Sequence, residues 1–82
     1  MVMGPAELAF ALGFDANFVD DVRLGYHTGR KPDFIVMNSL YRDWHARSAL
    51  TYPDVHVHVR HVLASRYVMV FRNSSYSIHR RR

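Results

Sequence analysis

The chain has 82 residues, a net charge of +4 and a pI near 10.0. Its hydrophobic fraction of 49% excludes an intrinsically disordered chain, and its length allows one small domain, residues 1–82. The absence of cysteine excludes disulfides and thiolate zinc sites as sources of stability. No stretch approaches the roughly 20 apolar residues of a membrane span. We therefore expect a virion or cytoplasmic location, and stabilisation by a homo-oligomer or a larger partner.

The first predicted element is a short helix that begins at Gly4-Pro5, because proline is pre-organised for the first helical position. Leu8 and Leu12 give this helix one apolar face, and Gly13 is a natural C-terminal stop. The helix is expected to pack against the rest of the domain through that face.

A second helix is predicted to begin at Asp15, whose carboxylate can cap orphan backbone N–H groups. Phe18 and Val22 would share one face at a spacing of four residues. Gly25 or Gly29 would end the segment, and a loop rich in turn-forming residues follows.

The most informative stretch joins a strand directly to a helix. The apolar run Phe34–Met37 is short enough for a strand and has the composition of one that is buried on both faces. Asn38 and Ser39 can both cap a helix N-terminus, and we assign Ser39 to capping and Asn38 to the junction. Leu40 and Trp44 then recur at helical spacing, so a helix is predicted from here to Arg47.

The C-terminal half is predicted to form an antiparallel meander. In Val55–His61 valine alternates with polar residues, which is typical of a strand with one apolar face. Ala64-Ser65 would make a bend before the second strand, Arg66–Arg72. A turn at Asn73 would lead into a third strand, Tyr76–His79.

These elements predict an α+β fold: a small, mostly antiparallel sheet of about four strands with two or three short helices packed on it. The core is expected to be formed by the large apolar residues that face inward in these elements. They are Leu8, Leu12, Phe18, Val22, Phe34, Val36, Leu40, Trp44, Val57, Val68, Val70 and Ile78.

The histidines His56, His58 and His61 are the candidate metal ligands. In a strand, His56 and His58 would project from the same face, so both could reach one metal ion. The acidic ligand that often completes such a site is missing, because the only glutamate is Glu7. The alternative is that these histidines form the solvent face of an amphipathic strand. We adopt that interpretation and expect neither a metal nor another cofactor.

No catalytic constellation is evident in the sequence. Ser39 follows a strand, but the Gly-x-Ser-x-Gly pattern of a nucleophile elbow is absent. Asp43 and His45 would point to different faces of one helix. Gly25 and Gly29 lack the Lys-Ser/Thr of a phosphate-binding loop. We therefore expect that the protein is not an enzyme and has no small-molecule substrate.

Basic and aromatic residues of the predicted strands suggest nucleic-acid binding as an alternative function. Aromatic side chains on a sheet can stack on single-stranded bases while neighbouring arginines contact phosphates. The three terminal arginines could add to such a surface or form a solvated, frayed end. The candidate contacts are Arg60, Arg66, Tyr67, Arg72, Asn73, Arg80, Arg81 and Arg82.

The segment Pro32–Tyr41, PDFIVMNSLY, resembles a phrase in the C-terminal part of tailed-phage major capsid proteins of the Hong Kong 97 type. The order of features from Asp15 onward is similar to the axial-domain part of that family. The Gly-x-Pro that usually precedes the alternating strand is replaced by Tyr52-Pro53-Asp54. The family's N-terminal arm, extended loop and spine helix have no counterpart. The resemblance implies a structural protein that belongs to, or docks on, a phage particle.

Two other phrases resemble the signatures of Sm-like RNA-binding proteins. They are Gly13–Asn17, GFDAN, and Val70–Ser74, VFRNS. In that family an acidic residue and an asparagine of the first phrase, and an arginine and an asparagine of the second, contact RNA. This resemblance implies a ring oligomer that binds RNA or single-stranded nucleic acid. The expected function is therefore structural self-association or docking without catalysis, with nucleic-acid binding as the alternative.

Overall fold

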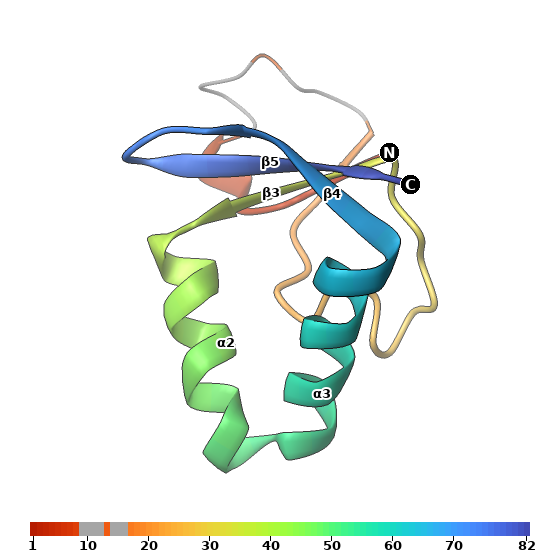
Figure 1. The fold of residues 1–82 in the computed structure, drawn as a ribbon, viewed down its shortest axis with the longest axis vertical. Coiled ribbons are helices and arrows are strands. Elements are labelled where there is room, and N and C mark those ends of the chain that lie inside the picture. The colour runs from red at the N-terminus through yellow and green to blue at the C-terminus, as the bar shows by residue number, and fades with distance from the viewer. Residues whose placement is uncertain (9–12, 14–16) are drawn as a thin grey trace.

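The computed structural model describes residues 1–8, 13 and 17–82, which form an α+β domain. Residues 6–8 are helical, and the predicted positions Leu12 and Asp15 lie outside the described residues. One sheet lies across the top of the molecule, and two helices lie against one of its faces (Figure 1). The layers are therefore a sheet and a helical hairpin, as α+β packing requires.

The sheet has five strands in the order β2-β1-β3-β5-β4. Two-residue strands β1 (Val2–Met3) and β2 (Phe18–Val19) run parallel to each other, and β1 runs parallel to β3 (Phe34–Asn38). β5 (Tyr76–Arg81) is antiparallel to both β3 and β4 (Tyr67–Arg72). The predicted α+β class is confirmed, and the sheet is a mixed one of five strands because the short parallel strands β1 and β2, which were not expected, extend the antiparallel part.

The predicted strand and helix around Asn38 are confirmed. β3 leads directly into α2 (Ser39–Thr51), and the Asn38 side chain caps this helix by accepting a hydrogen bond of 3.1 Å from the Tyr41 N–H. The cap is therefore Asn38 and not Ser39, which is already the first helical residue. The Asn38 amide also donates to Glu7, at 2.8 Å, so the cap ties the N-terminal segment to the sheet.

The predicted strand at Val55–His61 is wrong, because this segment is the helix α3 (Pro53–His61). Pro53 occupies the first turn of the helix, where its missing N–H costs nothing. Val55, Val59 and Val62 are buried at helical spacing, whereas Val57 is 66% exposed. A π-helical turn, η1 (Val62–Arg66), replaces the expected bend and leads into β4.

Two further predictions are corrected at the ends of the chain. Phe18 belongs to strand β2, so the expected helix does not run through it and Val22. Arg80 and Arg81 are part of β5, and the Arg82 N–H donates to the Arg66 carbonyl at 2.9 Å. The terminal arginines are therefore held by the sheet rather than frayed.

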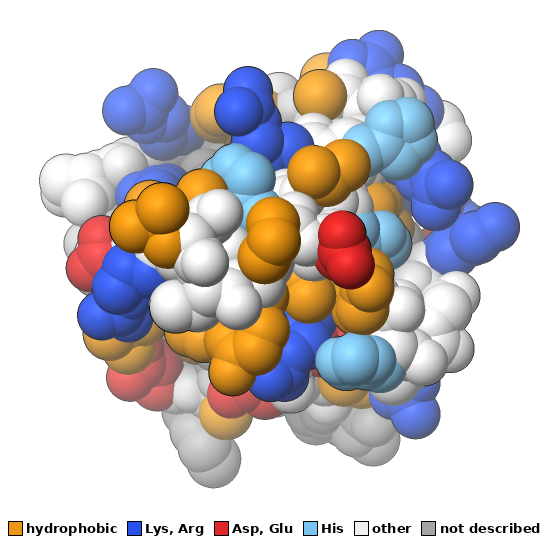
Figure 2. Space-filling model, turned by 90° about the horizontal axis from the view of Figure 1, so that it is seen from below, with side chains coloured by type: hydrophobic (Ala, Val, Ile, Leu, Met, Phe, Trp, Pro, Cys, Tyr) orange, Lys and Arg blue, Asp and Glu red, His pale blue; other side chains and the backbone are white. Residues whose placement is uncertain are grey.

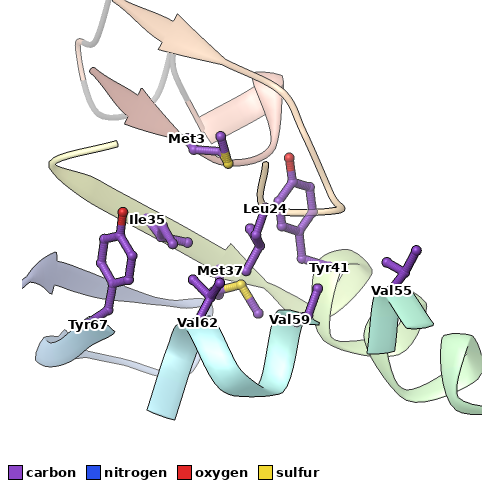
Figure 3. Close-up of a cluster of buried hydrophobic side chains, with 9 residues drawn as sticks. All are labelled: Met3, Leu24, Ile35, Met37, Tyr41, Val55, Val59, Val62 and Tyr67. Atoms are coloured by element: carbon purple, nitrogen blue, oxygen red, sulfur yellow. The ribbon is translucent and has the colours of Figure 1, made fainter. Parts of the chain in front are cut away.

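The core lies between the inner face of the sheet and the helical hairpin (Figure 3). Residues from β1, β3, α2, α3, η1 and β4 meet there, together with one loop residue. They are Met3, Leu24, Ile35, Met37, Tyr41, Val55, Val59, Val62 and Tyr67. Burial, with a hydrogen bond from the Tyr41 hydroxyl to Asp20, raises the pKa of Tyr41.

Most of the residues predicted to form the core are not among the buried core residues of the structure. Val36 is fully buried as expected, but Leu40 is 61% exposed and Val70 is 48% exposed. Phe34 is also an exposed residue. The remaining described members of the predicted set are only partly buried: Leu8, Phe18, Val22, Trp44, Val68 and Ile78. Adjacent residues of a strand point to opposite faces, which explains why Ile35 is buried in the core while its predicted neighbour Phe34 is exposed.

Candidate docking surface at the β4 edge

β4 forms one edge of the described sheet, and its exposed side chains are unusually apolar. β5 pairs with one side of the strand, and no described strand pairs with the other side. Met69, Val70 and Phe71 are 49%, 48% and 46% exposed. Edge strands of soluble proteins are usually short or charged, because their free N–H and C=O groups invite pairing with another chain. This six-residue strand has neither protection along its centre.

The exposed residues of β4 are presented on different faces of the sheet. Met69 pairs in register with His79 and shares the helix-facing side of the sheet with it. Phe71 pairs with Ile78 and faces the opposite side, where its ring lies 5.7 Å from that of Tyr76. The ladder shifts register between Met69 and Phe71, so Val70 is the extra residue of a bulge. An added strand would therefore meet apolar side chains on both faces.

A pocket of about 360 Å³ lies under the helix-facing side of β4. Leu63 and Met69 contribute apolar surface to it, and Arg42, Arg72 and His79 contribute nitrogen donors. No carboxylate is among its lining residues. The pocket beside the strand is thus apolar and positively charged, so it is suited to negatively charged side chains.

A hydrogen-bond chain orders the polar wall of this pocket. The Arg42 guanidinium donates to the Ser77 hydroxyl at 3.1 Å, and that hydroxyl lies 2.9 Å from Nε2 of His79. Burial lowers the pKa of His79, and the nearby positive charge of Arg42 lowers it further. Neutral His79 can then accept the Ser77 proton, so that serine is an oriented, buried hydroxyl between two basic groups.

The charged side chains of β4 and of its pocket are all basic. No acidic residue follows Asp54 in the sequence, while Arg66 and Arg72 bracket the strand. Both ion pairs among the described residues involve Asp33, which binds the N-terminal amine at 2.8 Å and Arg81 at 3.1 Å. The amine holds the pKa of Asp33 below its usual range. The positive charges of Arg66 and Arg72 have no such partner in the described part of the chain.

The candidate nucleic-acid residues are not gathered on one surface. Arg60 is exposed on α3, and Arg80 pairs with Phe34 and Val68 on the outer face of the sheet. The Tyr67 ring is 3% exposed, and its hydroxyl donates to the Pro32 carbonyl at 2.5 Å. Burial raises its pKa. A ring in this position packs in the core and cannot stack on a base.

Asn73 and the last arginines have structural partners. The Asn73 side chain accepts hydrogen bonds from the N–H groups of Ser75 and Tyr76, both at 2.8 Å, and so forms the β4–β5 turn. Arg81 binds Asp33 and the Lys31 carbonyl. Arg72, Arg80 and Arg82 remain exposed.

The three candidate metal-binding histidines diverge, because successive residues of a helix are rotated by about 100°. The His56 ring lies 2.9 Å from the His45 carbonyl, and His58 Nε2 lies 3.0 Å from the Leu24 carbonyl. His61 contacts Ser65. Within residues 1–8, 13 and 17–82, no three His, Cys, Asp or Glu side chains come close enough to share a metal ion.

His45, which the sequence suggested only as a possible partner of Asp43, has a structural role instead. It is buried, and its Nε2 lies 2.6 Å from the Val22 carbonyl. Burial lowers the pKa of His45, as does the neighbouring His56. These contacts join α2 to the loop and to α3, so His45 and His56 act as packing residues of the helical hairpin.

A second exposed apolar region lies on the helical hairpin, opposite the sheet. Leu50, Tyr52 and Val57 are 91%, 52% and 66% exposed. Figure 2 shows the molecule from this side, where hydrophobic side chains lie toward the middle and basic side chains occur around much of the outline. No described helix is long and apolar enough to cross a membrane.

None of the comparisons with known proteins identifies a relative. No protein-family model, no curated protein and no solved structure matches this chain. The β4 edge therefore has to be interpreted from its own geometry and charge.

Proposed function

We propose that this chain is a non-enzymatic docking module that adds an extended, acidic segment of a partner protein to its sheet along β4. The observation that carries the proposal is the apolar, half-exposed centre of an edge strand, Met69–Phe71. Binding by strand addition takes affinity from main-chain hydrogen bonds and specificity from side-chain pockets. Docking on a larger particle, as expected from the capsid-like resemblance, is one form of this activity.

The geometry supplies both parts of such a binding mode. The free backbone groups of β4 offer the hydrogen bonds, and an added strand would place alternate side chains above and below the sheet. The side chains on the helix-facing side would lie beside the pocket under Met69, where Arg42 and Arg72 could bind an anionic group. Those above would meet Phe71 and Tyr76.

Charge favours an acidic partner over a second copy of this chain. Arg66 and Arg72 flank the strand, and an antiparallel pair of β4 strands centred on Met69 would place Arg66 of one copy opposite Arg72 of the other. Like charges directly opposite each other destabilise a strand pair. Glutamates at both ends of a partner segment would instead form charge-assisted hydrogen bonds.

The proposal is tested by titrating the isotope-labelled protein with a synthetic peptide of alternating valine and threonine that carries two glutamates at each end. We expect the amide signals of Met69, Val70 and Phe71 to shift, and binding to weaken with salt. Val70→Asp should weaken binding by about tenfold or more, because it places a negative charge at the centre of the edge. Val57→Asp, on the exposed side of α3, is the matched control and should bind like the original chain.

Three outcomes would overturn the proposal. The first is the absence of any shift in β4 at millimolar peptide. The second is equal binding of a peptide with lysines in place of the glutamates. The third is a dimer in sedimentation that becomes tighter with salt and is abolished by Val70→Asp, which would assign the same edge to self-association.

Single-stranded nucleic acid is the second candidate, and the Phe71–Tyr76 ring pair favours it. The two rings lie on the outer face of the sheet with a centroid distance of 5.7 Å, and exposed Arg80 shares that face. This function predicts salt-sensitive binding of oligo(dT) or oligo(U) that Phe71→Ala weakens. Arg80→Ala, on the same face, should also weaken it, whereas Arg47→Ala on α2 should not. No detectable binding at low salt would exclude this function.

A further inference from the structure

A second pocket, of about 120 Å³, lies at the start of β4, where Arg66 and Tyr67 contribute to its lining. It opens to solvent and is lined by the loop that precedes β3, by α3 and η1, and by the end of β5. Its floor is apolar and buried, since Leu24, Val62 and Tyr67 are 2%, 4% and 3% exposed. The volume is close to that of an apolar cavity of about 150 Å³ that holds one benzene ring.

The loop that forms one wall is held in a single shape. Leu24 and Gly25 have φ values of 49° and 81°, and a Cβ on Gly25 would lie 2.5 Å from the Arg30 carbonyl oxygen. The chain can therefore close back on itself here only with glycine at position 25. The ring of His58 and the hydroxyl of Tyr67 hydrogen-bond to loop carbonyls and fix the wall to α3 and β4.

The rest of the lining is basic. Arg30, Lys31, Arg66 and Arg81 line the pocket, and no carboxylate does. Asp33 neutralises Arg81, but neither described ion pair includes any of the other three. These three side chains are exposed, so their charged ends can move over the pocket. A buried apolar floor with several cations around it is complementary to an anion that carries a small apolar body.

We infer that this pocket binds a small organic carboxylate whose apolar part is about the size of one six-membered ring. The ring or branched alkyl group fills the space above Leu24 and Val62, and the carboxylate meets Arg30, Lys31 and Arg66. A guanidinium such as that of Arg66 matches a carboxylate with two parallel hydrogen bonds. This site shares only Arg66 with the flanks of the β4 edge, uses none of the central residues Met69–Phe71, and does not depend on the function proposed for that edge.

The test uses benzoate as the probe and benzamide as its neutral isostere. In a nuclear magnetic resonance titration, benzoate should shift the methyl signals of Leu24 and Val62 at millimolar concentration. Benzamide should bind at least tenfold more weakly, because it cannot form the charge-assisted contacts. Arg66→Met should weaken benzoate binding by about tenfold, whereas Arg47→Met, an exposed arginine on α2, should leave it unchanged.

Each alternative outcome has a clear meaning. Equal affinity for benzoate and benzamide, or unchanged binding in Arg66→Met, would overturn the role of the cations. Binding of inorganic phosphate in preference to benzoate would overturn the role of the apolar floor. No shift at Leu24 and Val62 up to tens of millimolar benzoate would overturn the site itself. Val70→Asp should leave benzoate binding intact, which separates this result from the failure of docking at β4.

Discussion

Strands β3 and β4 have similar sequences and opposite environments. β3 reads FIVMN and β4 reads YVMVFR, so both are continuous apolar runs. In β3, Ile35, Val36 and Met37 are 0%, 0% and 4% exposed. In β4, the corresponding centre of the strand, Met69 and Val70, is about half exposed. Composition alone would have assigned the two strands the same place in the sheet.

The difference arises from what each strand has as neighbours. β3 lies between β1 and β5, with the core below it and the Gly4 and Phe18 region against Val36 above. β4 has β5 on one side, and only its first residues lie over the helices. An apolar run that the fold itself does not cover is a feature of association surfaces. The comparison therefore separates the apolar residues that stabilise the fold from those that we assign to docking.

The largest expected effect is that of Ile35→Ala in β3. This side chain is fully buried in the core, so its removal loses transfer free energy and leaves a cavity. We expect the free energy of unfolding to fall by about 2–5 kcal/mol. Denaturant unfolding measures it, with Leu50→Ala as control, because Leu50 is 91% exposed. Equal losses in the two variants would contradict the burial assigned to β3.

Val36→Thr should have the next largest effect. The substitution keeps the side-chain shape but places a hydroxyl at a position that is 0% exposed. Burying that hydroxyl without a good partner should lower the free energy of unfolding by about 1–3 kcal/mol. Thermal unfolding followed by circular dichroism is a suitable measurement. A change below about 0.5 kcal/mol, the usual size for surface substitutions, would show that this face of β3 is open.

Asn38→Ala should cost about 1 kcal/mol, in the range of measured N-cap losses. It removes the acceptor for the Tyr41 N–H and the donor to Glu7. Ser39→Ala is the matched control, since Ser39 was the residue expected to cap from sequence, and its loss should be smaller. Denaturant unfolding of both variants measures the two losses. A larger loss in the free energy of unfolding for Ser39→Ala would show that Ser39 caps the helix, as predicted from sequence.

The parts of the fold that could be predicted are those governed by local signals. The strand at Phe34–Met37, the helix after it and the β4–β5 hairpin follow from apolar runs, cap residues and turn residues. The error at α3 has a specific cause: the segment VHVHV alternates like a strand, but Val55, Val59 and Val62 also repeat at helical spacing. Pro53 before this run was the available signal for a helix start.

The remaining features depend on contacts between distant segments. β1 and β2 contain two residues each and exist because they pair with each other and with β3. Arg66 and Arg72 were candidates from sequence, but the edge position of β4 follows only from the strand order. The small pocket could not be predicted, since its wall is a loop shaped by Gly25 and by bonds to α3 and β4.

The smallest expected effect completes the comparison of the two strands. Val70→Thr is the same substitution as Val36→Thr, but Val70 is 48% exposed at the bulge of β4. Water can satisfy the added hydroxyl there, and threonine fits a strand as well as valine does. We expect the free energy of unfolding to change by no more than about 0.5 kcal/mol. Two equal effects would mean that β4 is covered in solution, for instance by a second copy, and a concentration-dependent midpoint would then identify self-association.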